Sequence, residues 1–165
     1  MQKLTDQVKL LQKIVLVHRG EFLILQRSPK SHYRPNQWDL PGGNSHWPTQ
    51  TEGDLAQPHL SDVLRELEEE TDIAIRDEKL DLVGQIAQSS PIYFGTYFEA
   101  QKQLFTMIVG WQLNLPDEFD RSRVKLSHEH TQQVWIKPSQ FDEYDFGFAG
   151  KKDGFIWEMV EKMSI

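Results

Sequence analysis

Apolar residues recur along this chain with two different periods, and each period predicts its own kind of element. Runs rich in aliphatic residues, bounded by polar, glycine-containing or proline-containing segments, predict β-strands at residues 8–17, 21–26, 38–40, 80–88, 104–115 and 134–136. Gly20 lies between the first two runs and indicates a β-hairpin. Helical spacing of apolar residues predicts one helix from about residue 58 or 59 to 71 and a C-terminal helix over 155–163.

The remaining segments read as connections. Polar loops are predicted at 28–36, 44–57 and 117–129, and Pro138 is predicted to begin a turn or a helix. Strands outnumber helices and do not alternate with them regularly, which predicts an α+β fold with a mixed sheet and helices on its faces. The chain has 165 residues and no internal repeat, so residues 1–165 are expected to form a single domain.

The helix predicted over 59–71 carries an unusual set of charges. Its buried stripe should consist of Leu60, Val63, Leu64, Leu67 and Thr71. Beside that stripe, Glu66, Glu69 and Glu70 fall within an arc of about 100° and repel one another. A hard cation such as Mg²⁺, which takes oxygen ligands, would compensate the repulsion. Arg65 lies one turn before Glu69 and can pair with it, and Asp72 can end the helix in a left-handed conformation.

A plainer interpretation is a solvated acidic face, which is what acidic runs on helices usually are. Glu68, on the opposite side of the helix, is expected to be such a solvated residue. Arg65, the apolar stripe and the upstream sequence Trp38-Asp39-Leu40-Pro41-Gly42-Gly43 favour a functional site instead.

These residues resemble the Nudix hydrolases, whose box reads G-x5-E-x7-R-E-U-x-E-E-x-G-U, with U a bulky aliphatic residue. Matches to the box are Arg65, Glu66, Leu67, Glu69, Glu70 and Ile73. The resemblance covers most of the chain and implies an α/β/α sandwich with a mixed sheet. It also implies a pyrophosphohydrolase that cleaves a diphosphate bond in a nucleoside diphosphate-linked substrate, such as a nucleoside triphosphate, a sugar nucleotide or a dinucleoside polyphosphate.

The chain departs from the box at three points. Gly43 and Arg65 are 22 positions apart, whereas the box spacing is 14, so an insert of eight residues is expected within about 45–56. The first box glutamate falls on Gln57, with Glu52 as a possible replacement, and the last box glycine is Asp72. We expect the insert to shape substrate access, with Trp47 packing over the site or against a second subunit of a homodimer.

The metal would be Mg²⁺ or Mn²⁺. We expect Glu66 and Glu70 to bind it directly and Glu69 to share a second ion. The resemblance implies that the backbone carbonyl of Gly42 or Gly43 completes the shell. Arg65 would orient Glu69 rather than touch the substrate.

The general base and the substrate contacts are less sharply indicated. The base is either a box glutamate or Glu129, which precedes the strand at 134–136, although Glu129 could equally be an exposed loop residue. Its neighbours His128 and His130 are interpreted as surface histidines. Phosphate could bind Arg27, Arg34 or the backbone at Gly42, although each arginine could be an ordinary surface residue. The nucleobase of a substrate could stack on one of five aromatic residues, some of which must be core residues: Tyr33, Tyr93, Phe94, Tyr97 and Phe98.

The composition of the chain limits the kinds of molecule that it is expected to bind. The formal net charge of −7 argues against a duplex nucleic-acid binder, but it allows a small phosphorylated substrate bridged by divalent metal. No apolar run is long enough to span a membrane, and we expect a cytoplasmic protein because cysteine is absent.

Three alternatives stay open. One is a non-catalytic Nudix-fold module that senses a nucleotide or binds a partner, and another is a purely structural acidic helix. The third, an isoprenoid diphosphate isomerase, is disfavoured because that chemistry relies on a cysteine in the family.

Overall fold

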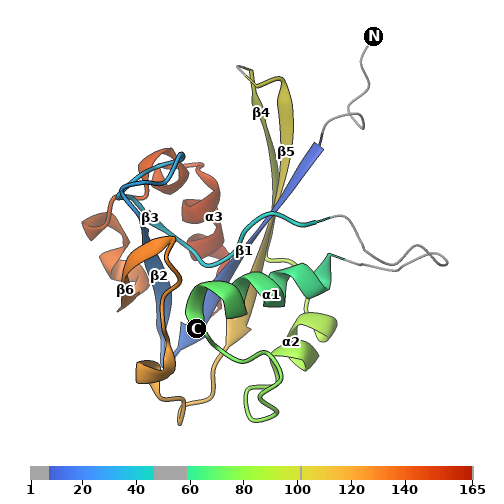
Figure 1. The fold of residues 1–165 in the computed structure, drawn as a ribbon, viewed down its shortest axis with the longest axis vertical. Helices are drawn as coiled ribbons and strands as arrows, with labels where there is room; N and C mark the ends of the chain where they lie inside the picture. The colour runs from blue at the N-terminus through green and yellow to red at the C-terminus, as the bar shows by residue number, and fades with distance from the viewer. Residues whose placement is uncertain (1–7, 47–58, 101, 165) are drawn as a thin grey trace, which may run out of the picture.

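The computed structural model describes residues 8–46, 59–100 and 102–164, which fold around a six-stranded mixed sheet (Figure 1). The strands are β1 (Val8–His18), β2 (Glu21–Arg27), β3 (Trp38–Asp39), β4 (Tyr93–Glu99), β5 (Leu104–Asn114) and β6 (His130–Ile136). Their order is β3-β2-β1-β5-β4, and β6 pairs with β2. β1 and β5 run parallel over ten residue pairs, whereas the other pairings are antiparallel.

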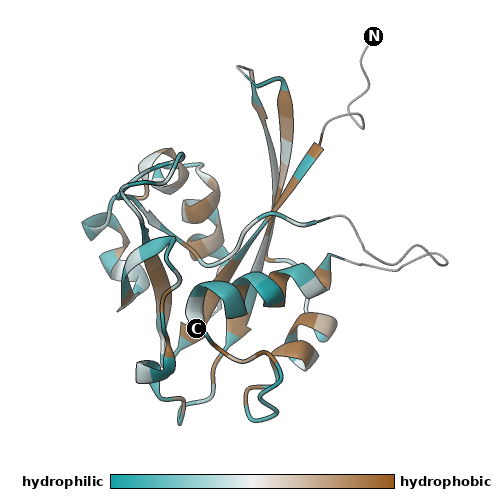
Figure 2. Ribbon diagram, in the orientation of Figure 1, coloured by the Kyte–Doolittle hydropathy of each residue, from teal (hydrophilic) through white to brown (hydrophobic). Residues whose placement is uncertain are grey.

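Helices cover both faces of the sheet, as the alternation of side chains along β1 requires. Ile14 and Leu16 pack into one core with α1 (Leu60–Thr71) and α2 (Leu82–Gln88). Val15 and Val17 point to the opposite face and pack with α3 (Phe155–Lys162) and the 3-10 helices η3 (Pro138–Glu143) and η4 (Gly147–Gly150). Figure 2 shows apolar strands between these layers and a hydrophilic outer side of α1. The expected α/β/α sandwich is therefore confirmed.

β1 and β2 separate after their turn, and the segment that carries the glycines fills the gap. The two strands pair only at Val17–Phe22 and His18–Glu21. Farther along, β2 pairs with β3, while β1 donates backbone hydrogen bonds from Ile14 to Pro41 and from Gln12 to Gly43. This wedge fixes residues 41–43 in the middle of the sheet, beside α1.

Two elements differ from the sequence predictions. Residues 82–88 form the helix α2 rather than a strand, because Leu82 and Ile86, four residues apart, are both buried in the core under it. The aromatic stretch forms the edge strand β4, which has Tyr97 on one face and the exposed Phe94 and Phe98 on the other. Among the described residues, no helix is long and apolar enough to cross a membrane.

Most of the other predicted elements within the described residues are confirmed. The hairpin, β3, β5, β6 and the C-terminal helix lie where the apolar pattern placed them. α1 begins after His59 and ends at Asp72, whose φ of 58° is left-handed as predicted. Most of the insert and the residues Trp47, Glu52 and Gln57 lie outside the described residues.

Candidate active site

The three carboxylates of α1 that were predicted to bind metal lie at three different depths. Glu70 is buried, Glu66 is half-buried, and the side chain of Glu69 is 57% exposed. The apolar stripe explains this gradient, because Val63, Leu64, Leu67 and Thr71 are buried and Glu70 lies closest to them around the helix. Glu68 is half-buried rather than fully solvated, and its Oε1 accepts a long hydrogen bond of 3.4 Å from the backbone of Ile75.

Arg65 holds the outer two carboxylates. Its guanidinium donates to Glu69 Oε2 and to Glu66 Oε1, both at 2.8 Å, and to Asp62 Oδ1 at 3.2 Å. The predicted pairing with Glu69 is confirmed, and the arginine also fixes Glu66. Arg65 and Glu69 lie on the outer side of the helix and are not in the lining of the neighbouring cleft.

The Gly42-Gly43 turn meets the inner two carboxylates. The backbone N–H of Gly42 donates to Glu70 Oε2 at 2.7 Å, and the φ of Gly42 is +125°. A Cβ on Gly43 would stand 2.5 Å from the Glu66 carboxylate. Glycine is required at position 42, where φ is positive and a Cβ would clash with the backbone oxygen of Gln12, whereas a Cβ at position 43 would displace the Glu66 carboxylate.

A cleft of 290 Å³ runs along this turn and brings together most of the predicted site. The predicted residues that line it are Arg27, Tyr33, Arg34, Gly42, Gly43, Glu66, Glu70, Tyr97 and Glu129. Glu129 reaches the cleft because its loop is tied down: Glu129 accepts a backbone hydrogen bond from Ser28 (2.8 Å), and Ser127 donates one to Glu70 (3.3 Å). Tyr97, Phe148 and Phe155 add an aromatic wall.

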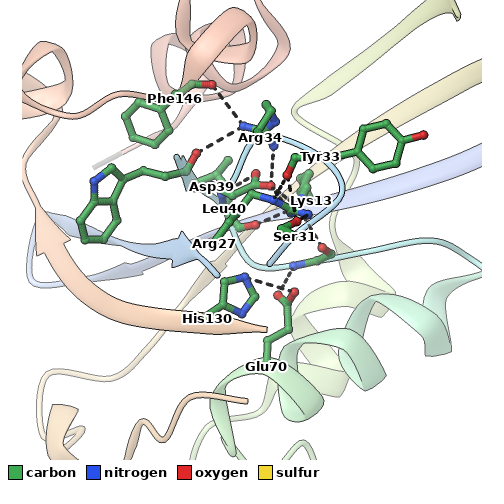
Figure 3. Close-up of polar contacts among 12 residues, drawn as sticks. Lys13, Arg27, Ser31, Tyr33, Arg34, Asp39, Leu40, Glu70, His130 and Phe146 are labelled. Carbon is green, nitrogen blue, oxygen red and sulfur yellow. Dashed lines mark hydrogen bonds and ion pairs between the residues drawn. The ribbon is translucent and has the colours of Figure 1, made fainter. Parts of the chain in front are cut away.

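One wall of the cleft holds a buried carboxylate surrounded by cations (Figure 3). Asp39, with a side chain 1% exposed, pairs through Oδ2 with Lys13 Nζ and Arg27 Nη1, both at 3.1 Å, and with Arg34. Burial alone would raise the pKa of Asp39, but the three cations outweigh it and lower that pKa to about 2. Arg27 and Arg34 are therefore partners in a buried network, which corrects their interpretation as ordinary surface arginines.

Glu70 has the opposite electrostatics. Burial raises its pKa to about 8, and neither Lys13 nor the Gly42 N–H offsets this effect. His130 Nε2 lies 3.7 Å from Glu70 Oε1, too far for a hydrogen bond, and burial together with Lys13 lowers the histidine's pKa to about 4. His130 is buried, so its interpretation as a surface histidine was wrong, whereas His128 is exposed.

Comparisons with known proteins bear on this arrangement through the fold alone. No family model and no curated protein matches the chain. A MutT protein from Methanosarcina mazei Go1 is 21% identical, with a TM-score of 0.65 over 96% of this chain and 97% of its own. A MutT NUDIX hydrolase from Burkholderia pseudomallei is 17% identical, with a TM-score of 0.61 over 96% and 99%. An Ap4A hydrolase from C. elegans, solved as a binary complex, is 22% identical, with a TM-score of 0.58 over 93% of each chain.

The chain has the Nudix hydrolase fold. In this Nudix fold the carboxylate helix α1 and the Gly-Gly turn face each other across one cleft, as the box residues predicted.

Of the three glutamates predicted to bind metal, only Glu66 and Glu70 line the cleft. Within residues 8–46, 59–100 and 102–164, no group of three or more His, Asp or Glu side chains is arranged to hold a metal. Glu66 and Glu70 nevertheless share the cleft with the Gly42 and Gly43 carbonyls, which already accept hydrogen bonds from Lys13 Nζ and the Gln12 backbone. This donor set fits Mg²⁺, which is usually held by one or two carboxylates and completes its shell with water and substrate phosphates.

Three residues of this candidate site, Lys13, Asp39 and His130, were not predicted as site residues from the sequence. A signal for Lys13 existed, since it lies within a largely aliphatic run that predicts a buried strand, and its side chain is indeed nearly fully buried. Its ammonium donates to the carbonyls of Leu40 (3.0 Å) and Gly42 (2.9 Å). Asp39 stands between Trp38 and Leu40 in the shortest strand, where a charge is equally unexpected.

Proposed function

We propose that this chain is a divalent-metal-dependent hydrolase that cleaves a diphosphate bond in a nucleoside diphosphate-linked substrate. The observation that carries the proposal is the bipolar cleft, where Glu66 and Glu70 line one part and Lys13, Arg27 and Arg34 line another. Carboxylates attract the metal, and cations attract the phosphates that the metal must meet.

The acidic part would hold the metal. Glu66 and Glu70 would be its direct ligands, with a backbone carbonyl of Gly42 or Gly43 as a further one. A bound Mg²⁺ or Mn²⁺ would neutralise phosphate charge and lower the pKa of the attacking water. Arg65 would keep Glu66 in position through the 2.8 Å hydrogen bond that it donates. Glu69 would contribute through Arg65, or bind a second ion after the arginine has released it.

The basic part would hold the diphosphate. Three cations surround the single carboxylate of Asp39, so this cluster keeps a surplus of positive charge toward the cleft. The guanidinium of Arg34 lies 5.7 Å from the centre of the Phe148 ring and 5.8 Å from that of Phe155. An aromatic base could join this stack beside Tyr97 while its phosphates point toward the glycine turn.

Glu129 would accept the proton of the attacking water. Glu66 and Glu70 would be occupied as ligands, and Glu129 is a cleft carboxylate from a different loop. A base of modest strength suffices, because metal already acidifies the water.

A substrate panel tests the proposal. Nucleoside triphosphates, sugar nucleotides, dinucleoside polyphosphates and capped RNA are incubated with Mg²⁺ or Mn²⁺, with and without excess chelator. Dinucleoside polyphosphates belong on the panel because the C. elegans protein of similar fold is an Ap4A hydrolase. We expect metal-dependent release of phosphate or nucleoside monophosphate. Turnover that survives full chelation would refute metal dependence, and tight binding without turnover on any substrate would indicate the non-catalytic module instead.

A further inference from the structure

A second, larger cleft continues from the candidate active site. It measures 460 Å³ and lies between the loop after β2 and the loop before β6. Arg27, Tyr33 and Glu129 line both clefts. A substrate whose diphosphate lies against Arg27 can therefore extend directly into the second cleft.

The walls of this second cleft are held together before any ligand arrives. Arg27 donates from Nε to the Tyr33 carbonyl (2.8 Å) and from Nη2 to Ser31 Oγ (2.7 Å), which closes the loop after β2 around the arginine. Ser28 N–H donates to the Glu129 carbonyl at 2.8 Å and joins the two loops. Tyr33 is fixed from outside, because Lys102 Nζ lies 3.7 Å from its ring centre. Such preorganisation lowers the cost of ordering the site on binding.

The lining of the second cleft is rich in nitrogen donors. Besides Arg27 it contains Lys30, His32 and His128, and among the described residues Glu129 is its only carboxylate. The buried His130 also lines it, and its Nδ1 has no hydrogen-bond partner within the described part of the chain. Ser28 and Ser31 add hydroxyl groups at the same wall. Cations and neutral donors with so little negative charge suit phosphate oxygens better than an uncharged sugar.

We propose that the second cleft binds further phosphates of the substrate, so that this protein prefers polyphosphate chains longer than a diphosphate. This inference rests on the proposed function, because it takes the first cleft as the place of cleavage. It assigns Lys30 and His32 to substrate specificity and gives them no part in the chemistry.

Binding of inorganic phosphates tests the inference without turnover. Dissociation constants of tripolyphosphate and pyrophosphate are measured by calorimetry in Mg²⁺ for the wild type, for the double variant Lys30→Ala/His32→Gln, and for Lys79→Ala. Lys79 is an exposed cation outside the lining of both clefts, so its variant controls for the general loss of positive charge. We expect the double variant to bind tripolyphosphate about tenfold more weakly, to lose less affinity for pyrophosphate, and to differ from the control.

The possible results separate the two proposals. If the panel is cleaved but the ratio of the two dissociation constants is the same in all three proteins, the inference is overturned and the proposed function stands. If nothing is cleaved but the ratio changes as expected, the polyphosphate site stands and the hydrolase does not. If the enzyme is active, adenosine tetraphosphate and diadenosine tetraphosphate are compared as substrates to show which kind of polyphosphate the cleft accepts. The double variant should have an about tenfold higher KM for the accepted substrate. An unchanged KM for both substrates would overturn the inference.

Discussion

Asp39 and Glu70 are both buried carboxylates of the same cleft, yet their pKa values are shifted in opposite directions. The pKa of Asp39 is lowered to about 2, whereas that of Glu70 is raised to about 8. Burial acts in the same direction on both, so the difference comes from their neighbours. Asp39 has three cationic partners, whereas Glu70 is favoured as an anion by the charge of Lys13 and by the Gly42 N–H, which the charges of Asp39 and Glu66 oppose.

The opposite pKa shifts distinguish two kinds of surroundings. Asp39 belongs to a structural network in which cations surround it, whereas Glu70 has too little positive charge around it. The Asp39 cluster already has its counter-charges, so it can set the shape of the cleft without a ligand. Because its pKa is raised, Glu70 is protonated at neutral pH. A bound divalent cation would supply positive charge and favour the ionised carboxylate instead. Substitutions at the two carboxylates should therefore act on different properties.

The largest effect on stability is expected at Asp39. Asp39→Asn removes the charge partner of the buried Lys13 and should lower the free energy of unfolding by about 3–5 kcal/mol. The measurement is urea denaturation at pH 7, with the exposed Asp142→Asn as the matched control, which should stay within about 0.5 kcal/mol of the wild type. A loss below about 1 kcal/mol at Asp39 would mean that the network does not support the fold.

The largest effect on catalysis is expected at Glu70. Glu70→Gln keeps the shape and the acceptor for the Gly42 N–H but removes a ligand charge, so kcat should fall about 10³-fold. Its melting temperature in chelator should be unchanged or higher, because folding no longer has to protonate a buried acid that is ionised in the unfolded state. Rates and melting curves are compared with the exposed Glu78→Gln. A large drop in melting temperature with an unchanged rate would show that Glu70 is structural.

A smaller catalytic effect is expected at Glu129. Loss of a general base typically costs 10²- to 10⁴-fold, so Glu129→Gln should lower kcat by at least about 10²-fold with metal affinity nearly unchanged. Glu143→Gln, at another exposed carboxylate, serves as the control. If kcat falls less than about threefold, far below the range for a base, the role passes to a helix glutamate. Collapse of metal binding would make Glu129 a ligand.

The smallest effect is a pH dependence of stability without metal. Between the ordinary pKa of 4.5 and its folded pKa of about 8, Glu70 binds a proton in the folded state but not in the unfolded state, so stability falls as pH rises. His130 acts oppositely between pH 4 and its ordinary pKa of 6.5, where only the unfolded state is protonated. From pH 6.5 to 8 the opposing His130 effect no longer changes with pH, and the Glu70 effect should cost on the order of 1–2 kcal/mol.

Denaturation at several pH values in chelator measures this slope. Glu70→Gln should remove it, and saturating Mg²⁺ should reverse it by favouring the ionised carboxylate. A slope that persists in the variant would place the titrating group elsewhere.

The sequence predicted the acidic side of the cleft because that side is largely local. Helical spacing determines the arc of Glu66, Glu69 and Glu70, and one turn separates Arg65 from Glu69. How deep each carboxylate lies follows from the same periodicity. Long aliphatic runs likewise predicted β1, β2 and β5, since their length leaves little doubt about the period.

The Asp39 cluster could not be predicted in the same way, because it is assembled by pairing across the sheet. Lys13 comes from β1, Arg27 ends β2, and Asp39 reaches both only after β3 has entered the gap between those strands. The strand predicted where α2 lies was wrong for another reason. Over seven residues, the buried pair Leu82 and Ile86 fits a strand nearly as well as a helix.

The central claim is that Glu70 is a ligand of a divalent-cation site. Its most direct test is calorimetric titration of the metal-stripped protein with Mn²⁺ at pH 7 in buffers of different ionisation enthalpy. Because the pKa of Glu70 is about 8, binding should release about one proton at pH 7 and progressively fewer above pH 8. Glu70→Gln should bind Mn²⁺ at least about tenfold more weakly and release no proton. Equal affinity and equal proton release in both proteins, or no binding by the wild type, would contradict the account.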